Sequence, residues 1–138
     1  METVVSTFEA GVTEHDAEVE RTTADELGEV LDRVLEEPAV GTPIDDVVDL
    51  DLESLSVEVD LDPTPAEVEA AATGITPAMY GIAEYGSVVI EGIEAGVEPV
   101  SLYPTEHVAV VAESTILPDM RTAVTKIGEE KRENPRNL

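Results

Sequence analysis

The chain has 138 residues, of which 42% are hydrophobic and only 3% aromatic, and it contains no cysteine. It carries 32 Asp and Glu residues against 7 Lys and Arg residues, so its formal net charge at pH 7 is −25. This charge disfavours nucleic-acid binding, and the lack of cysteine excludes disulfides, cysteine nucleophiles, thiolate-bound zinc and iron–sulfur ligation by this chain.

The acidic residues are spread along the chain, which is typical of a solvated surface on a folded domain. A folded protein this acidic, with few lysines, fits a high-salt cytoplasm in which ions screen the self-repulsion. Residues 1–30 show no basic stretch followed by an apolar one, and no apolar run has the length of a membrane span. We therefore expect a cytoplasmic, halophilic protein with a core of Val, Ile, Leu and Ala.

The N-terminal third predicts two helices. Residues 1–16 have apolar residues at roughly helical spacing and predict a short helix, and residues 17–22 predict a brief strand centred on Val19. Residues 23–26 form a capping box that opens a second helix, and Pro38 ends it. The apolar stripe of this helix is Leu27, Val30, Leu31, Val34 and Leu35, and an ion pair between Glu29 and Arg33 is expected on its outer face.

The middle of the chain alternates between strands and a helix. Residues 39–41 predict a short buried strand, residues 42–55 a connection that is either a loop or a short helix, and residues 56–62 a half-buried strand near a sheet edge. A second capping box, residues 64–67 with proline at the first helical position, predicts a short helix that ends at Gly74 in a left-handed conformation.

The remaining elements surround two long apolar runs. Strands are expected over residues 82–83 and 87–90, interrupted by Glu84-Tyr85-Gly86. A loop over 91–99 and a strand over 100–103 make a hairpin plausible on sequence grounds. The continuous apolar run from His107 to Ala112 is typical of a central strand covered on both faces. Pro118 opens a last helix with Met120, Val124 and Ile127 on one side, and residues 129–138 form a polar tail or a truncation point.

Two residues are candidates for chemistry. Glu84, at a strand break beside Gly86, is either a base, nucleophile or ligand anchor, or a carboxylate satisfied by nearby backbone N–H groups. His107, at the start of an apolar strand, is either a site residue or a histidine that closes a local hydrogen bond. Ser87 lacks the Gly-x-Ser-x-Gly setting of a nucleophile elbow, and no histidine spacing typical of a metal site occurs.

Three segments in the centre of the chain carry a family resemblance. They are Ala-Thr-Gly-Ile-Thr-Pro-Ala from residue 72, Ile-Ala-Glu-Tyr-Gly-Ser-Val-Val from residue 82, and Pro-Val-Ser-Leu-Tyr-Pro-Thr-Glu-His-Val-Ala-Val-Val from residue 99. In their order and spacing they resemble the LUD domain, the lactate-utilisation family, and in particular its small stand-alone C-type component in a halophilic archaeal form. The resemblance spans about residues 17–127.

The resemblance implies an α/β fold related to the sugar-phosphate isomerase and CoA-transferase-like proteins, with a sheet flanked by helices. The domain would occupy residues 17–128, after an N-terminal segment over 1–16. By motif position, the resemblance carries over a pocket for a small acid or a cofactor, lined by Gly74, Glu84, Gly86, Ser87, Pro104 and His107.

The resemblance also implies a place beside iron–sulfur subunits in the oxidation of lactate to pyruvate, with the clusters on those partners and no cofactor in this chain. Family members continue beyond the segment 134–138 into another strand and further motifs, so we expect the chain to lack one strand. The sheet edge exposed by that loss could then pair with a second copy.

Three hypotheses follow. The first is a binding and assembly subunit of lactate utilisation without redox chemistry of its own. The alternative is a stand-alone isomerase- or acyl-transfer-like enzyme that uses Glu84, or an inactive truncated remnant.

The charge gives a first test. Because ions screen the repulsion among the acidic side chains, the fold is expected to need molar salt. The melting temperature, followed by circular dichroism, should rise as KCl is increased to molar concentration. A melt that does not depend on KCl would contradict the halophilic interpretation.

Overall fold

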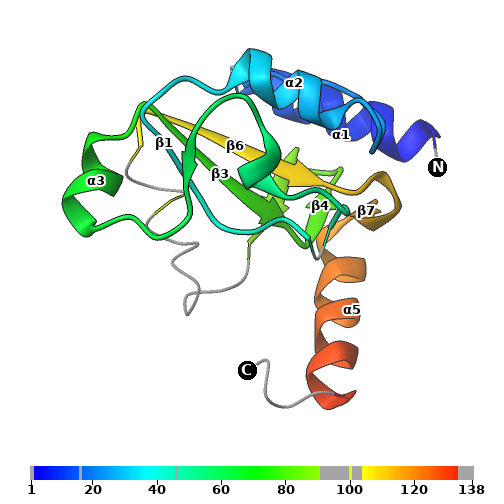
Figure 1. The fold of residues 1–138 in the computed structure, drawn as a ribbon. Helices are drawn as coiled ribbons and strands as arrows, with labels where there is room; N and C mark the ends of the chain where they lie inside the picture. The colour runs from blue at the N-terminus through cyan, green and yellow to red at the C-terminus, as the bar shows by residue number, and fades with distance from the viewer. Residues whose placement is uncertain (1, 16, 46, 91–99, 101–103, 134–138) are drawn as a thin grey trace. The chain divides into compact units, whose positions relative to one another are not determined.

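The computed structural model describes residues 2–15, 17–45, 47–90, 100 and 104–133, and it shows a mixed α/β fold with a parallel sheet flanked by helices (Figure 1). The chain divides into two compact units. Residues 20–79 and 90–112 form the first, which we call the parallel unit. Residues 1–19, 80–89 and 113–138 form the second, which we call the hairpin unit. The expected fold class is confirmed.

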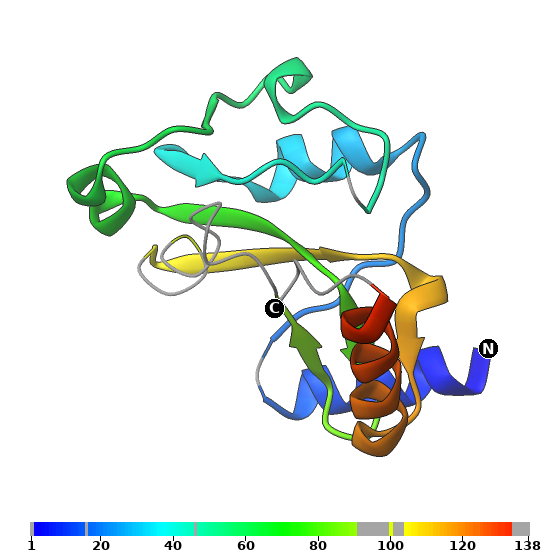
Figure 2. The ribbon, with the colours of Figure 1, turned by 90° about the horizontal axis from the view of Figure 1, so that it is seen from below.

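The parallel unit is built on a four-stranded sheet with the order β2-β1-β3-β6, in which every neighbouring pair is parallel (Figure 2). Its strands are β1 (Ala39–Gly41), β2 (Val59–Asp60), β3 (Thr73–Ala78) and β6 (Glu106–Val111). The expected strands at 39–41 and near 59–60 are confirmed, the latter shorter than expected and at an end of the strand order. Strand β3 was not expected from the sequence, because Gly74 and Pro77 both disfavour strands.

Helix α2 (Leu27–Val34) covers one face of this sheet. Its Leu27 and Leu31 pack in one buried cluster with Ile75 of β3, where Leu31 is 1% and Ile75 0% exposed. The capping position is confirmed in part, since Thr23 Oγ1 accepts a hydrogen bond from the Glu26 N–H at 3.3 Å, but the helix itself begins at Leu27. The expected pair of Glu29 with Arg33 is wrong, because the Arg33 guanidinium instead pairs with Glu20, which precedes the helix.

The parallel unit also contains the 3₁₀ turn η1 (Leu52–Ser54) and the short helix α3 (Pro65–Ala70). The second capping box is confirmed in both directions. Thr64 Oγ1 accepts from the Glu67 N–H at 3.2 Å, and Glu67 Oε1 accepts from the Thr64 N–H at 2.8 Å. The expectation that Gly74 ends this helix in a left-handed conformation is wrong, because α3 ends at Ala70 and Gly74 lies inside β3.

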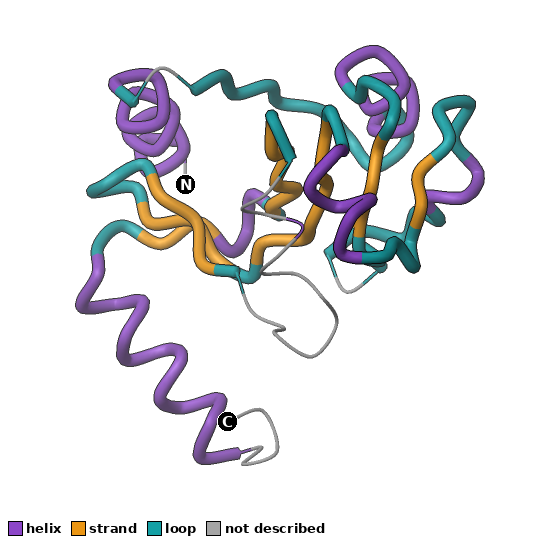
Figure 3. The backbone as a smooth tube through the Cα atoms, turned by 90° about the vertical axis from the view of Figure 1, so that its left-hand side faces the viewer, coloured by secondary structure: helices purple, strands orange, loops and turns teal. Residues whose placement is uncertain are grey.

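The hairpin unit has a three-stranded sheet with the order β5-β4-β7 (Figure 3). Strands β4 (Tyr80–Ile82) and β5 (Ser87–Val89) are antiparallel, and β7 (Ile116–Leu117) is parallel to β4. Helix α1 (Glu2–Glu14) packs against β5 and β7, and the 3₁₀ turn η3 (Glu113–Thr115) leads into β7. The expected N-terminal helix and the two strands interrupted by residues 84–86 are confirmed.

Helix α5 (Met120–Glu133) packs against β4 and β7 of the same unit. Met120 is 41% exposed and Val124 is 61% exposed, whereas Ala123 is 0% exposed. Ala123, and not Met120 or Val124, therefore meets the sheet. The helix also continues past Gly128 into the segment expected to be a polar tail.

Three further expectations are revised or remain open. The brief strand over 17–22 is wrong, since its residues are in irregular structure and exposed, apart from half-buried Val19. The strand after Pro104 is confirmed as β6, but it lies at the end of the strand order among the described residues and is half-buried from His107 to Val111, so it is not central there. The expected loop over 91–99 and the strand over 100–103 lie outside the described residues, apart from Val100, whose backbone is helical. No described helix is both long and apolar enough to cross a bilayer.

Candidate functional site

The parallel sheet has two faces with different chemistry, because successive side chains of a strand point to opposite sides. The register places Ala39, Thr73 and Glu106 in one row, and the next row begins with Gly41 and Ile75. This face carries the cluster under α2. The opposite face has Val40, Gly74 and His107 in one row. Beyond them on the same face lie Thr42, Thr76 and Ala109.

We call Thr42 and Thr76 of one row, together with His107 of the adjacent row, the polar row. Thr76 Oγ1 lies 2.7 Å from His107 Nε2, a hydrogen bond between adjacent strands β3 and β6. Thr76 is 0% exposed, while His107 is half-buried. Burial lowers the pKa of His107, because it penalises the charged imidazolium. A neutral imidazole that accepts the Thr76 proton at Nε2 carries its own proton on Nδ1.

The contacts around position 74 explain why β3 needs a glycine there. A Cβ at this position would overlap the carbonyl oxygen of Val100 and would lie 2.9 Å from Pro104 Cγ. The segment that brings Pro104 here is held by two backbone bonds, from the Thr105 N–H to Ala71 O at 3.2 Å and from the Glu106 N–H to Ala72 O at 3.0 Å. The structure thus brings together three of the expected site residues, Gly74, Pro104 and His107.

The other three expected site residues, Glu84, Gly86 and Ser87, belong to the β4–β5 hairpin of the hairpin unit. Glu84 is exposed, and its backbone N–H donates to Pro118 O at 3.1 Å. The negative charge of Glu84, together with a hydrogen bond from the phenol, raises the pKa of the exposed Tyr85. Ser87 is exposed at the start of β5 and pairs with Ile82.

Gly86 has a packing role in that hairpin. Its φ of 63° lies in the left-handed region that glycine adopts without strain. A Cβ at Gly86 would overlap the backbone of Gly11 and Val12 in helix α1. The backbone that closely approaches this glycine is therefore that of a helix in the same unit, and a ligand contact at Gly86 stays a prediction.

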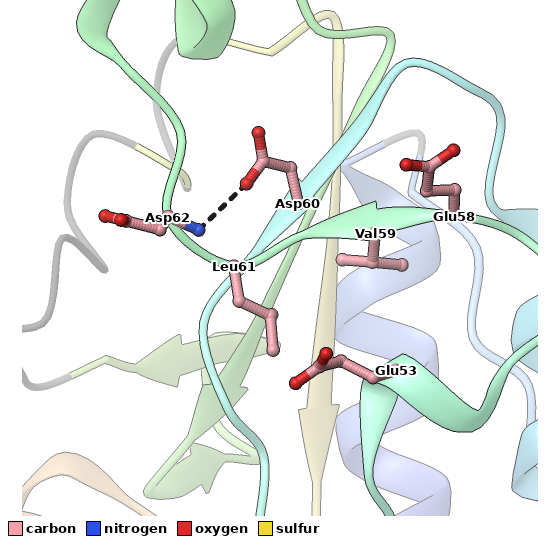
Figure 4. A pocket seen from close by; sticks show the side chains of 6 residues that line it. All are labelled: Glu53, Glu58, Val59, Asp60, Leu61 and Asp62. Carbon is pink, nitrogen blue, oxygen red and sulfur yellow. Dashed lines mark hydrogen bonds between the residues drawn. The ribbon is translucent and has the colours of Figure 1, made fainter.

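A third feature is an acidic hollow of about 500 Å³ beside strand β2 (Figure 4). It is lined by Val59 and Leu61 and by four carboxylates, those of Glu53, Glu58, Asp60 and Asp62. One of these four carboxylates is used locally, since Asp60 Oδ1 accepts a hydrogen bond from the Asp62 N–H at 2.9 Å. The backbone N–H of Glu58 donates to Glu37 Oε2 at 3.0 Å. Across the described part of the chain, no three His, Asp or Glu side chains converge in a way that would hold a metal ion.

Two residues of the polar row were not expected from the sequence. Thr76 becomes visible as a site residue only once residues 73–78 are known to be a strand, since it then shares a face with Gly74. Thr42 follows β1, and its N–H continues the ladder by donating to Ile75 O at 3.1 Å. The signal available in the sequence was the pattern Thr-Gly-Ile-Thr over 73–76, whose alternation is too short to assign a strand.

The comparisons with known proteins bear on this geometry. The model of the LUD domain matches residues 21–138, which includes every element of the parallel sheet. The chain belongs to the LUD-domain family. This family is associated with lactate utilisation.

A solved structure agrees with the fold of this LUD domain. It is a DUF162 family protein from Deinococcus radiodurans, with a TM-score of 0.77 and 23% identity, and the match covers 96% of this chain and 82% of that one. At this identity the likeness concerns the fold. The comparison with curated proteins found no match.

The contact at Gly74 gives a stability test. Replacing Gly74 by alanine should destabilise the LUD domain by about 1–3 kcal/mol, because a methyl group forces the Val100 and Pro104 backbone away from the sheet. Chemical denaturation followed by circular dichroism measures the change. Gly28→Ala is the matched control: its Cβ would meet only Leu55 at 3.8 Å, and in a helix the change should stabilise by up to about 1 kcal/mol. Equal effects of both variants would contradict the packing role.

The burial of His107 gives a pH test. An NMR titration of its imidazole should give a midpoint below the ordinary histidine value of about 6.5. With a lowered pKa in the folded state, the unfolded chain binds more protons than the folded chain as the pH falls below 6.5. The contribution of His107 to stability is therefore present above pH 6.5 and is lost on acidification. The stability difference between the wild type and His107→Gln should follow that loss. A midpoint above 6.5 would overturn the burial argument.

Proposed function

We propose that this LUD domain is an accessory subunit of lactate utilisation, a binding and assembly module in the oxidation of lactate to pyruvate. The family match over residues 21–138 is the observation that carries the proposal. Iron–sulfur subunits would act beside it and carry the redox centres, since a chain without cysteine lacks the usual ligands of such clusters. Its place of action would be the cytoplasm.

The polar row and the Gly74 contact support the binding part of the proposal. A half-buried histidine hydrogen-bonded to a buried threonine offers directional polar groups on an otherwise apolar sheet face, which is typical of small-molecule sites. Pro104 and Val100 lie against the same face and hold it in shape. We assign ligand contact to Thr76 and His107, with Gly74 and Pro104 as positioning residues.

A genetic experiment tests the role. A strain that lacks this gene should fail to grow on lactate as sole carbon source and should grow normally on pyruvate. The 138-residue chain is expected to restore growth on lactate. Normal growth of the deletion strain on lactate would refute the proposal, and failure of complementation by a chain that folds would show that this form alone is inactive.

The same strain separates the subunit from the alternative enzyme. Complementation with Glu84→Gln should restore growth as well as the wild type does, because the exposed Glu84 has no catalytic task in the subunit. Loss of growth with normal folding and normal partner binding would favour the isomerase- or acyl-transfer-like enzyme. Ser87→Ala, in the same hairpin and also exposed, is the matched control.

We further propose that the outer edge of β6 pairs with a second copy. Among the described residues β6 has a partner on one side only, β3, and five successive residues from His107 to Val111 are half-buried. Such an edge is a template for another strand. Size-exclusion chromatography with light scattering in molar KCl should give twice the mass of 14.7 kDa. A monomer mass at every concentration would contradict the pairing.

A further inference from the structure

The side chain of Thr42 is the one buried polar group among the described residues that lacks a hydrogen-bond partner. Thr42 is 3% exposed, and its Oγ1 has no hydrogen-bond partner. The two other buried threonines are satisfied. Thr73 Oγ1 donates to Glu36 O at 3.0 Å and accepts from the Glu36 N–H at 2.9 Å, and Thr76 bonds to His107. Buried hydroxyls without a partner are rare and call for an occupant such as water or a ligand.

Thr42 lies on the same face of the sheet as the other two residues of the polar row. Gly41 pairs with Ile75, and the Thr42 N–H continues the same ladder, so the Thr42 side chain shares a face with Thr76. Beside Thr76 on this face lie two small residues, Ala78 of β3 and Ala109 of β6, while Val100 and Pro104 cover Gly74. The polar side chains of Thr76 in β3, His107 in β6 and Thr42, which directly follows β1, therefore lie on one face of the sheet beside small residues.

The charges around the polar row select the class of ligand. The sequence has no Lys or Arg between Arg33 and Arg121, and Arg33 is paired with Glu20. Burial also favours the neutral form of His107. A buried carboxylate or phosphate would meet no Lys or Arg on the four strands of the parallel sheet and would add to a net charge of −25, which is unfavourable. Hydroxyl groups and a neutral imidazole suit an uncharged oxygen, which can both accept and donate.

We propose that Thr42, Thr76 and His107 bind the hydroxyl group of a small uncharged molecule, such as a polyol. Thr42 Oγ1 donates to the ligand oxygen, and the ligand hydroxyl returns its proton to an acceptor in the row. Water takes the same place when the ligand is absent. This inference rests on the binding role proposed above, but its readout is binding and not growth, so the two can fail separately.

The test uses the full chain in molar KCl, with glycerol as the uncharged probe and sodium formate as the anionic one. The imidazole signals of His107 are followed by NMR. Glycerol should shift them saturably in the wild type and in Thr42→Ser, with at least tenfold weaker binding in Thr42→Val, and formate should not shift them. A stronger response to formate than to glycerol would overturn the uncharged class. If glycerol caused no shift and a crystal structure showed only a water beside Thr42, the proposal that a small uncharged molecule binds here would be wrong.

Thermal melts keep the test independent of ligand affinity. Valine has nearly the shape of threonine, so Thr42→Val should melt below the wild type if the hydroxyl holds an occupant. A melting temperature above the wild type would mean that the hydroxyl is idle, and it would overturn the site. Thr73→Val is the matched control on the opposite face: it should lower the melting temperature, through the loss of two bonds to Glu36, and leave the glycerol response intact.

Discussion

The close approach of Val100 and Pro104 to the backbone of Gly74 is the contact on which the candidate site depends. A sheet face normally carries side chains that keep other backbone segments at a distance of several ångströms. At Gly74 there is none, so the Val100 carbonyl and the Pro104 ring rest directly on β3. The chain then enters β6 in a register that sets His107 beside Gly74 and within hydrogen-bond reach of Thr76. One missing side chain thus fixes where the histidine lies.

The two faces of the parallel sheet differ in the side chains that they carry. Under α2, large aliphatic residues such as Leu31 and Ile75 are fully buried, and they supply the hydrophobic stabilisation. On the other face, hydroxyls and small residues lie beside a smaller buried cluster of Val40, Ala71 and Val100. Polar groups on a buried face reduce stability unless each has a partner. Thr76 has such a partner in His107, whereas Thr42 has none among the described residues, and the binding role proposed above would supply one.

The described acidic residues of the chain lie at its surface and not in the polar row. Carboxylates gather beside β2 and along the exposed faces, where they are hydrated and cap local backbone N–H groups, as Asp60 does for Asp62. The polar row, in contrast, contains no carboxylate. A protein with this charge repels anions in general, and an uncharged ligand group avoids that repulsion. A LUD domain that holds such a group beside redox subunits would act through binding and assembly, without carrying the redox chemistry.

Local physical chemistry in the sequence determined much of the outcome. Patterns among residues close in sequence indicate the capping box at Thr64, the amphipathic stripe from Leu27, the strand at 39–41 and the interrupted strands around Glu84, and all are found. The motifs around Gly74, Glu84 and His107 were also sufficient to indicate the family. Tertiary structure alone decided the rest. Strand β3 forms in spite of Gly74 and Pro77 because its neighbours supply the hydrogen bonds. Arg33 pairs with Glu20 instead of Glu29, and Thr42 meets the face of Thr76, because strand order and chain reversal bring together residues that no local pattern connects.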